Sequence, residues 1–247
     1  MSMKISISDS FEKMSSLAAN DLIDLMQQFD RPLLCPASGD SPAGLYEIIA
    51  NKVQQSELDI SNWQFVGLDE WVGMNGEDEG SCRFHLNNQL FNPLQVSESS
   101  ISFFDGRSVD LQQECEKIEA FIFQNGGIDI AIIGLGLNGH IGMNEPGASV
   151  LSRSQVIALD PITISTGQKY FQKEQPLSEG ITLGIKTILE SKYIFLLVSG
   201  VHKSSIVAKV LEGEITADRP GTALRNHPGF RVYLDQASAS LLKTKTG

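Results

Sequence analysis

The hydrophobic positions of this chain follow a helical spacing in some segments and form short continuous runs in others. Residues 9–29 carry apolar side chains at helical spacing, which predicts a helix with Asp9 or Ser10 as its N-cap. Pro42 stands at the first turn of a second predicted helix, which continues through Ile49. Two further helices are predicted at about residues 108–125 and around residues 206–211.

Short apolar runs lie between these helical segments and predict buried strands. Continuous apolar strands separated by amphipathic helices indicate an α/β fold, with a single open, mostly parallel twisted sheet and helices on both faces. No repeat, low-complexity tract or linker divides the sequence, so we expect one domain over residues 1–247. The predicted strands cover residues 32–35, 63–68, 128–133, 193–198 and 230–234.

The net charge and the cysteine content exclude several kinds of binding partner and structural site. The formal net charge is −11, and a surface that binds nucleic acid or an anionic membrane needs a basic footprint, so neither partner is expected. The 3 cysteines are widely spaced and form no C-x-x-C pair, which argues against a disulfide framework and a zinc site. No apolar run approaches the roughly 18 residues of a membrane span. We therefore expect a cytoplasmic protein with a small-molecule partner.

Two polar turns follow predicted strands, where ligands bind in open α/β sheets. The first turn consists of Ser38, Gly39, Asp40 and Ser41 and precedes a helix, so free N–H groups, the helix dipole and two hydroxyls could cradle an anion. The second turn, Ser-Gly-Val-His-Lys-Ser, includes Lys203 as a point charge. A plain N-cap at Ser41 and a solvated lysine are the structural alternatives. Two such turns on one sheet favour a small phosphorylated ligand.

A glycine-rich loop follows the strongest predicted strand. Residues 134–139 spell G-x-G-x-x-G, and Asp160 lies about twenty residues further on, as in a dinucleotide-binding motif. That motif needs a helix directly after the glycines, but residues 141–147 read Ile-Gly-Met-Asn-Glu-Pro-Gly and start no ordinary helix. We therefore reject the dinucleotide interpretation. The loop instead presents four polar side chains close together, those of Asn138, His140, Asn144 and Glu145.

An acidic pair closes another predicted strand. Asp69 and Glu70 follow the apolar run at residues 63–68, so Asp69 should emerge at the ligand-binding edge of the sheet. A carboxylate beside a loop histidine and a second carboxylate can perform general acid–base catalysis. A helix cap or a solvated acid pair is the structural alternative.

Taken together, these segments resemble the amino-sugar-6-phosphate deaminase/isomerase family, in order, over roughly residues 10–235. Trp71 stands where glucosamine-6-phosphate deaminases usually carry Tyr, and together with residues 80–82 it is more similar to the galactosamine-6-phosphate branch. The segments that carry the resemblance are L-D-E-W at 68–71, G-S-C at 80–82, G-L-G-L-N-G-H-I-G-M-N-E-P-G at 134–147, G-I-T-L-G at 180–184, and V-S-G at 198–200 followed by Lys203.

The resemblance implies a Rossmann-like, amino-sugar-phosphate isomerase fold and a reaction without a metal or organic cofactor. A 2-amino-2-deoxyhexose 6-phosphate would become a ketose 6-phosphate and ammonia, with galactosamine 6-phosphate giving tagatose 6-phosphate favoured. Asp69 resembles the base that moves a proton between C2 and C1. His140 resembles the group that opens the sugar ring, oriented by Glu145. We expect the enzyme to be classed as a hydrolase, an isomerase and a deaminase. The implied phosphate cradle comprises Ser38, Gly39, Asp40, Ser41 and Lys203.

Two features depart from the family pattern. Asn138 stands beside the catalytic histidine where some members carry Asp, and its amide could hold the imidazole by a hydrogen bond but adds no negative charge. The lid of the family, placed at about residues 160–178, often supplies an arginine to the phosphate. Here it contains only Lys169 and Lys173 as basic residues. Lys169 lies near the expected position and is a possible phosphate contact.

Other functions stay open on the sequence alone. Glucosamine-6-phosphate deaminase, giving fructose 6-phosphate and ammonia, is the first alternative. A 6-phosphogluconolactonase shares the fold and a related glycine–histidine loop. A non-catalytic sugar-phosphate sensor is the third possibility. A sensor that regulates transcription would need a DNA-binding module, but only about eight residues precede the first predicted helix, and the net charge of −11 does not favour a basic DNA-binding surface. The family includes monomers and hexamers, so a homo-oligomer is possible.

Overall fold

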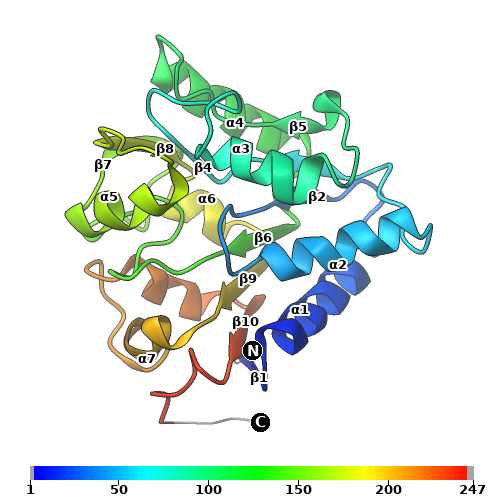
Figure 1. The fold of residues 1–247 in the computed structure, drawn as a ribbon. Coiled ribbons are helices and arrows are strands. Elements are labelled where there is room, and N and C mark those ends of the chain that lie inside the picture. The colour runs from blue at the N-terminus through cyan, green and yellow to red at the C-terminus, as the bar shows by residue number, and fades with distance from the viewer. Residues whose placement is uncertain (1–2, 244–247) are drawn as a thin grey trace.

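A central sheet of parallel strands runs through the part of the chain that the computed structural model describes, residues 3–243 (Figure 1). Its seven strands lie in the order β1-β10-β9-β6-β2-β3-β5, and each neighbouring pair is parallel. The predicted α/β fold with an open, mostly parallel sheet is thus confirmed. The strands are β1 (Lys4–Ser8), β2 (Leu33–Cys35), β3 (Gln64–Val66), β5 (Ile101–Ser102), β6 (Ile130–Ile133), β9 (Tyr193–Val198) and β10 (Phe230–Asp235).

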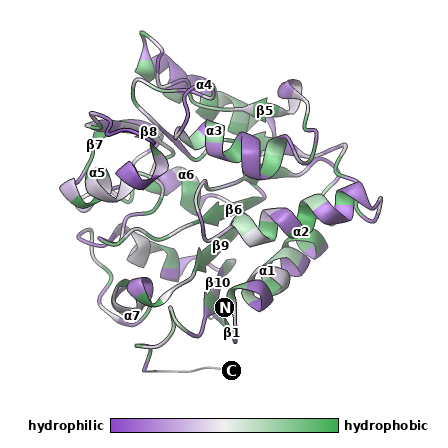
Figure 2. Ribbon diagram, viewed as in Figure 1, coloured by the Kyte–Doolittle hydropathy of each residue, from purple (hydrophilic) through white to green (hydrophobic). Residues whose placement is uncertain are grey.

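Helices cover both faces of this sheet. Successive strand side chains point to opposite faces, so Phe195 packs in one apolar cluster with α1, α2 and α3, whereas Leu196 packs in the other with α4, α6 and α7. Figure 2 shows the strands as largely hydrophobic and the helices as mixed. The helices are α1 (Phe11–Met26), α2 (Ala43–Gln54), α3 (Cys82–Leu86), α4 (Leu111–Gln124), α5 (Pro161–Gly167), α6 (Ile185–Leu189) and α7 (Ser204–Glu212).

Local sequence explains where the first helices begin. Ser10 is the N-cap of α1, and its hydroxyl accepts a hydrogen bond from the backbone N–H of Lys13 at 3.3 Å. Pro42 is the N-cap residue of α2 and makes no side-chain cap bond. Shorter segments complete the helical structure: a π-helical turn at Asn87–Phe91 and 3-10 helices at Glu98–Ser100, Gln168–Tyr170, Val201–Lys203 and Pro220–Asn226.

Five strands of the structure were not predicted as such, and one of them is the two-residue strand β5, which lies at one edge of the central sheet beside β3. The edge strand β1 pairs only with β10 and alternates polar and apolar residues, so it forms no continuous apolar run. The other three are short and form a second, antiparallel sheet in the order β4-β8-β7. In this sheet, Asp69 pairs with Thr182 across β4 and β8. The small sheet comprises β4 (Asp69–Trp71), β7 (Gln155–Ala158) and β8 (Glu179–Thr182).

The strand order places a crevice between β2 and β6. After β2 the chain proceeds to β3 and β5 on one side, whereas β6 is followed by β9 and β10 on the other. Loops that leave two such neighbouring strands diverge to opposite sides, and ligands of open α/β sheets bind at this switch point. The turn at residues 38–41 follows β2, and the glycine-rich loop at residues 134–139 follows β6. Segments that are distant in sequence therefore meet at one edge.

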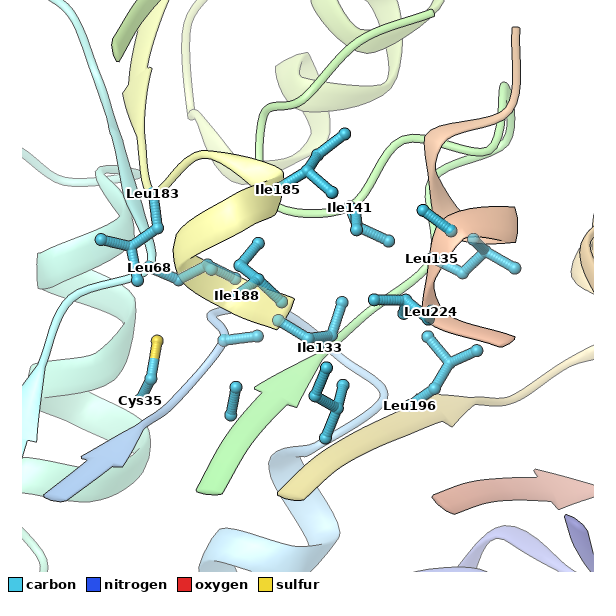
Figure 3. Packing of buried hydrophobic residues seen from close by; sticks show 14 of the residues in the cluster. Cys35, Leu68, Ile133, Leu135, Ile141, Leu183, Ile185, Ile188, Leu196 and Leu224 are labelled. Carbon is cyan, nitrogen blue, oxygen red and sulfur yellow. The ribbon is translucent and has the colours of Figure 1, made fainter. Parts of the chain in front are cut away.

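An apolar cluster fixes these loops from beneath (Figure 3). Leu68 directly precedes Asp69, and Leu135 and Ile141 lie on either side of His140 in the sequence. These three apolar side chains are at most 5% exposed. Burying one such side chain stabilises the fold by about 1.5–3 kcal/mol. The polar residues between them are therefore held on loops whose ends cannot shift freely.

Candidate active site

A cavity of about 460 Å³ lies at the carboxyl ends of β2, β6 and β9. Its walls come from the loops after these strands, the start of β4 and the segment at residues 160–178 that we call the lid. Two of the predicted site residues, Asn138 and Glu145, lie outside the lining and contact His140. The predicted residues that line the cavity are Ser38, Gly39, Asp40, Ser41, Asp69, His140, Lys169 and Lys203.

Asp69 is a buried carboxylate at the edge of this cavity. It begins β4 and is only 8% exposed. Burial raises the pKa of Asp69 to about 6, although a hydrogen bond from the Cys82 thiol and the positive charge of His140 act in the opposite direction. A carboxylate with a pKa near 6 is a far better proton acceptor at neutral pH than an exposed aspartate. The geometry therefore suits a general base.

Glu70, the next residue, has a different surrounding. Its side chain is fully buried, and its carboxylate accepts backbone N–H hydrogen bonds from Trp71, Cys82 and Arg83 at 2.8–2.9 Å. Burial raises the pKa of Glu70 to about 7, against the effect of these three donors. Because adjacent strand residues point in opposite directions, Glu70 faces away from the cavity that Asp69 lines. Glu70 thus fixes α3 against β4.

His140 depends on the glycines of its loop. A Cβ atom at Gly136 would lie 2.3 Å from the His140 ring, so only glycine leaves room for the imidazole. On its other side, the His140 Nδ1 atom lies 3.0 Å from Thr163 Oγ1 and 3.4 Å from Glu145 Oε2. An ionised carboxylate only accepts hydrogen bonds, so Nδ1 carries the hydrogen in neutral His140. The Nε2 lone pair is then available to take a proton.

Asn138 makes no hydrogen bond to the His140 ring and instead contacts the Glu145 carboxylate and the backbone of His140. Its Nδ2 donates to Glu145 Oε2 at 2.8 Å, and its Oδ1 accepts from the backbone N–H of His140 at 3.1 Å. The expected hydrogen bond from Asn138 to the ring is therefore replaced by these two contacts. Burial raises the pKa of Glu145, but the charge of the nearby His140 and the hydrogen bonds from Thr163 and Asn138 act in the opposite direction, so the pKa lies below its usual value.

The turns after β2 and β9 meet across the cavity. Ser41 Oγ lies 3.5 Å from Ser199 Oγ. Lys203 Nζ donates to the Leu135 carbonyl oxygen at 2.5 Å, and burial, together with the charge of Lys169, lowers the pKa of Lys203 to about 8. Hydroxyls and a partly desolvated ammonium group at one place suit an oxyanion such as a phosphate.

The lid contacts the turn after β2. Lys169 Nζ lies 2.6 Å from Asp40 Oδ2 and also lies over the Tyr170 ring, 4.7 Å from its centroid. Gly39 adopts φ +119°, a left-handed conformation that favours glycine, and a Cβ there would lie 3.3 Å from the Tyr170 hydroxyl. Asp40, predicted as part of a phosphate cradle, therefore pairs with a lid cation.

Sequence reasoning did not select several residues of the cavity. Thr163 belongs to the lid helix, and no local motif distinguishes it from the neighbouring Ser165 and Thr166. Trp71 and Cys82 stood within motifs that carried the family resemblance, and that was the available signal for them. Other lining residues without a predicted role are His85, Tyr170, Ser199 and His202.

Across residues 3–243, no group of three His, Cys, Asp or Glu side chains is arranged to hold a metal ion. Cys35, Cys82 and Cys115 are all buried and free. Within the same residues, the helices are too short or too polar to cross a membrane.

A buried carboxylate and an imidazole lie together in a cavity at the switch point of a parallel sheet, which is where α/β enzymes bind their ligands. A family model described as "Glucosamine-6-phosphate isomerases/6-phosphogluconolactonase" matches residues 8–232. The chain belongs to this family, within its amino-sugar-phosphate deaminase/isomerase group.

Curated relatives support this assignment over nearly the full length. The glucosamine-6-phosphate deaminase of Oceanobacillus iheyensis is 34% identical over 237 residues, which cover 96% of this chain and 95% of the relative. Glucosamine-6-phosphate deaminase 1 of Bacillus subtilis is 35% identical over 240 residues, which cover 97% of this chain and 99% of the relative. The expectation of a hydrolase is wrong, because these relatives are named deaminases and the family description names isomerases first.

Solved structures give the same family. A monomeric glucosamine-6-phosphate deaminase has a TM-score of 0.93 at 35% identity, and the match covers 97% of this chain and all of the other. The 6-phosphogluconolactonase of Thermotoga maritima has a TM-score of 0.73 at 18% identity, covering 95% of this chain and 98% of that one, which shows a shared fold.

Proposed function

We propose that this protein converts a 2-amino-2-deoxyhexose 6-phosphate into a ketose 6-phosphate and ammonia, with Asp69 as the general base and His140 as the ring-opening group. The observation that carries the proposal is the layout of the cavity. Asp69 and His140 lie in the same cavity as Ser41 and Lys203, so one bound molecule could present carbon-bound hydrogens to the first pair and a phosphate to the second.

Ring opening is assigned to His140. Its Nε2 atom takes the proton of the C1 hydroxyl and returns it to the ring oxygen, so the C1–O5 bond breaks and the aldehyde forms. The carboxylate of Glu145, whose Oε2 lies 3.4 Å from Nδ1, stabilises by its charge the imidazolium that forms during the transfer. Asn138 in turn holds Glu145 in place.

Proton transfer between carbons is assigned to Asp69. Its carboxylate takes the C2 proton of the open-chain sugar, which gives an enolamine, and delivers a proton to C1. C2 then carries an iminium group, to which water adds, and ammonia leaves as the C2 ketone forms. A pKa of about 6 lets Asp69 accept the proton and release it again near neutral pH.

The phosphate is assigned to the turns after β2 and β9. Ser38, Gly39, Ser41 and Lys203 all line that part of the cavity. Lys169 also lines it, although its ammonium group pairs with Asp40 in this structure. A phosphate dianion that binds beside Lys203 would favour the charged form of that lysine and attract Lys169 from the lid.

For the sugar, we propose galactosamine 6-phosphate as the preferred substrate. Trp71, Gly80 and Cys82, which carry the similarity to the galactosamine branch, all line the cavity. Their side chains and backbone could therefore contact the sugar hydroxyls. Glucosamine 6-phosphate is the second candidate, because the curated relatives bear that name.

The test is ammonia release from the purified protein with galactosamine 6-phosphate and glucosamine 6-phosphate in parallel, with the ketose product identified. A preference for the galacto sugar, with tagatose 6-phosphate formed, supports the proposal in full. A preference for the gluco sugar keeps the mechanism and removes the role of Trp71. Hydrolysis of 6-phosphogluconolactone without ammonia release, or tight sugar-phosphate binding without turnover, would overturn the proposal.

A further inference from the structure

Thr163 belongs to the lid but contacts the loop that follows β6. It lies in α5, which Asp160 caps by accepting a hydrogen bond from the backbone N–H of Ile162 at 2.8 Å. Although α5 is only 7 residues long and largely exposed, Thr163 is 4% exposed because it points toward His140. Its hydroxyl oxygen is 3.0 Å from His140 Nδ1.

We propose that Thr163 is the positioning residue that completes the hydrogen bonding of His140 when the lid is docked, so that lid closure assembles the ring-opening group. The proposal rests on the proposed function for its catalytic meaning. The contact itself depends only on the structure.

The distances indicate that Thr163, rather than Glu145, is the hydrogen-bond partner of His140 Nδ1. Glu145 Oε2 is 3.4 Å from Nδ1, beyond the usual length of an N–H···O hydrogen bond, and it already accepts from Asn138 at 2.8 Å. The Thr163 hydroxyl can accept from Nδ1–H and donate its own hydrogen to Glu145, whose pKa it helps to lower. A lid residue thereby connects the imidazole to its carboxylate.

The remainder of the lid is anchored elsewhere on the cavity. Gly167, at the end of α5, packs against the Trp71 ring, where an added Cβ would lie 2.9 Å from the indole. Two residues further on, Lys169 pairs with Asp40 at 2.6 Å. One short segment therefore contacts the phosphate side of the cavity through Lys169 and the ring-opening side through Thr163. A displaced lid would remove both contacts together.

Kinetics with three variants test the role. Thr163→Val removes the hydroxyl at nearly constant volume, Thr163→Ser retains it, and Ile162→Val is the control in the same helix, at an exposed side chain outside the cavity lining. Loss of a hydrogen bond to a charged group corresponds to about a tenfold to hundredfold change. We expect kcat of Thr163→Val to fall by this factor with KM changed less than about threefold, and both Thr163→Ser and Ile162→Val to stay close to the wild-type kcat.

Histidine side-chain NMR tests the contact without any substrate. The Nδ1–H proton of His140, assigned by its absence in His140→Asn, should be protected from exchange in the wild type and in Thr163→Ser, and should lose that protection in Thr163→Val. An unchanged signal and an unchanged kcat in Thr163→Val would overturn the proposal. An equal loss of kcat in all three variants, with the signal unchanged, would also overturn it by showing a general helix defect. A wild type that releases no ammonia from either sugar would refute the proposed function, and the NMR result would still decide the contact.

Discussion

Lys169 of the lid and Asp40 of the turn after β2 form an ion pair, 2.6 Å long, at the cavity. Both side chains are more than half exposed, and pairs of this kind contribute only about 0–1 kcal/mol in water. The hydrogen bond to Asp40 raises the pKa of Lys169 despite the opposing effect of burial, so its ammonium group stays charged at neutral pH. A weak pair between a charged lysine and a carboxylate can be exchanged for a stronger one with a phosphate dianion.

Replacing Lys169 by Ala should therefore weaken substrate binding. We expect KM to rise about tenfold with kcat changed less than about threefold, because one charge-assisted hydrogen bond to the phosphate is lost. Steady-state ammonia release measures both constants. Lys173→Ala, which removes the other lysine of the lid, is the control and should leave KM near the wild-type value. Equal effects of the two substitutions would point to general electrostatic attraction instead.

Asp69→Asn should abolish turnover while the sugar phosphate still binds. The amide cannot accept the C2 proton, so kcat should fall by at least about a thousandfold, within the range seen for loss of a general base. Calorimetry with the sugar phosphate should give a Kd within a few-fold of the wild-type value, because the phosphate contacts are intact. Asp24→Asn on the exposed face of α1 is the matched control. Near-normal turnover in Asp69→Asn would remove Asp69 from its assigned role.

The activity of the wild type should fall on the acid side near pH 6. Asp69 must be ionised to act as a base, and burial raises its pKa to about 6 in the folded protein. Measured as kcat/KM against pH, the rate should drop tenfold for each pH unit well below that value. A fall of kcat/KM that begins only near pH 4, as for an exposed aspartate, would contradict a pKa of Asp69 raised by burial.

The same buried carboxyl group should make stability depend on pH. Its pKa is about 6 in the folded protein and 3.8 in the unfolded chain, so its protonated form stabilises the fold below pH 3.8, and this contribution is lost as the pH rises through 6. The difference amounts to about 3 kcal/mol. Chemical denaturation should show Asp69→Asn gaining stability relative to the wild type between pH 4 and pH 7. A constant difference over that range would show that the carboxylate is already solvated in the fold.

Lys203 should make substrate binding weaken in alkali. Burial lowers its pKa to about 8, so the ammonium group loses its proton as the pH rises above that value. The KM of the wild type should therefore increase between pH 7 and pH 9.5 by about tenfold, the cost of one lost charged contact. Lys203→Arg keeps its charge throughout this range and should show a much smaller increase. The same rise in the arginine variant would assign the effect to the substrate amine instead.

The sequence by itself determined the five inner strands of the central sheet and the polar residues that follow them. Apolar runs such as residues 128–133 and 193–198 are buried on both faces in the fold, and burial of that kind leaves a pattern that can be read locally. Since ligand loops follow the strands of such a sheet, the sequence also selected Asp69, His140 and Lys203, which the structure brings to one cavity. The sequence also excluded a dinucleotide-binding motif at the glycine-rich loop, because the residues that follow the glycines cannot start the helix that this motif needs.

The tertiary structure alone decided how these residues are surrounded. Five strands, β1, β4, β5, β7 and β8, are short or lie at an edge, so pairing rather than an apolar run defines them. The separation of Asp69 from Glu70, one facing the cavity and one bonded to α3, follows from that pairing. Thr163 meets His140 because the lid docks on the loop after β6. A hydrogen bond between residues on separate elements depends on how those elements pack, and no periodicity along the chain records it.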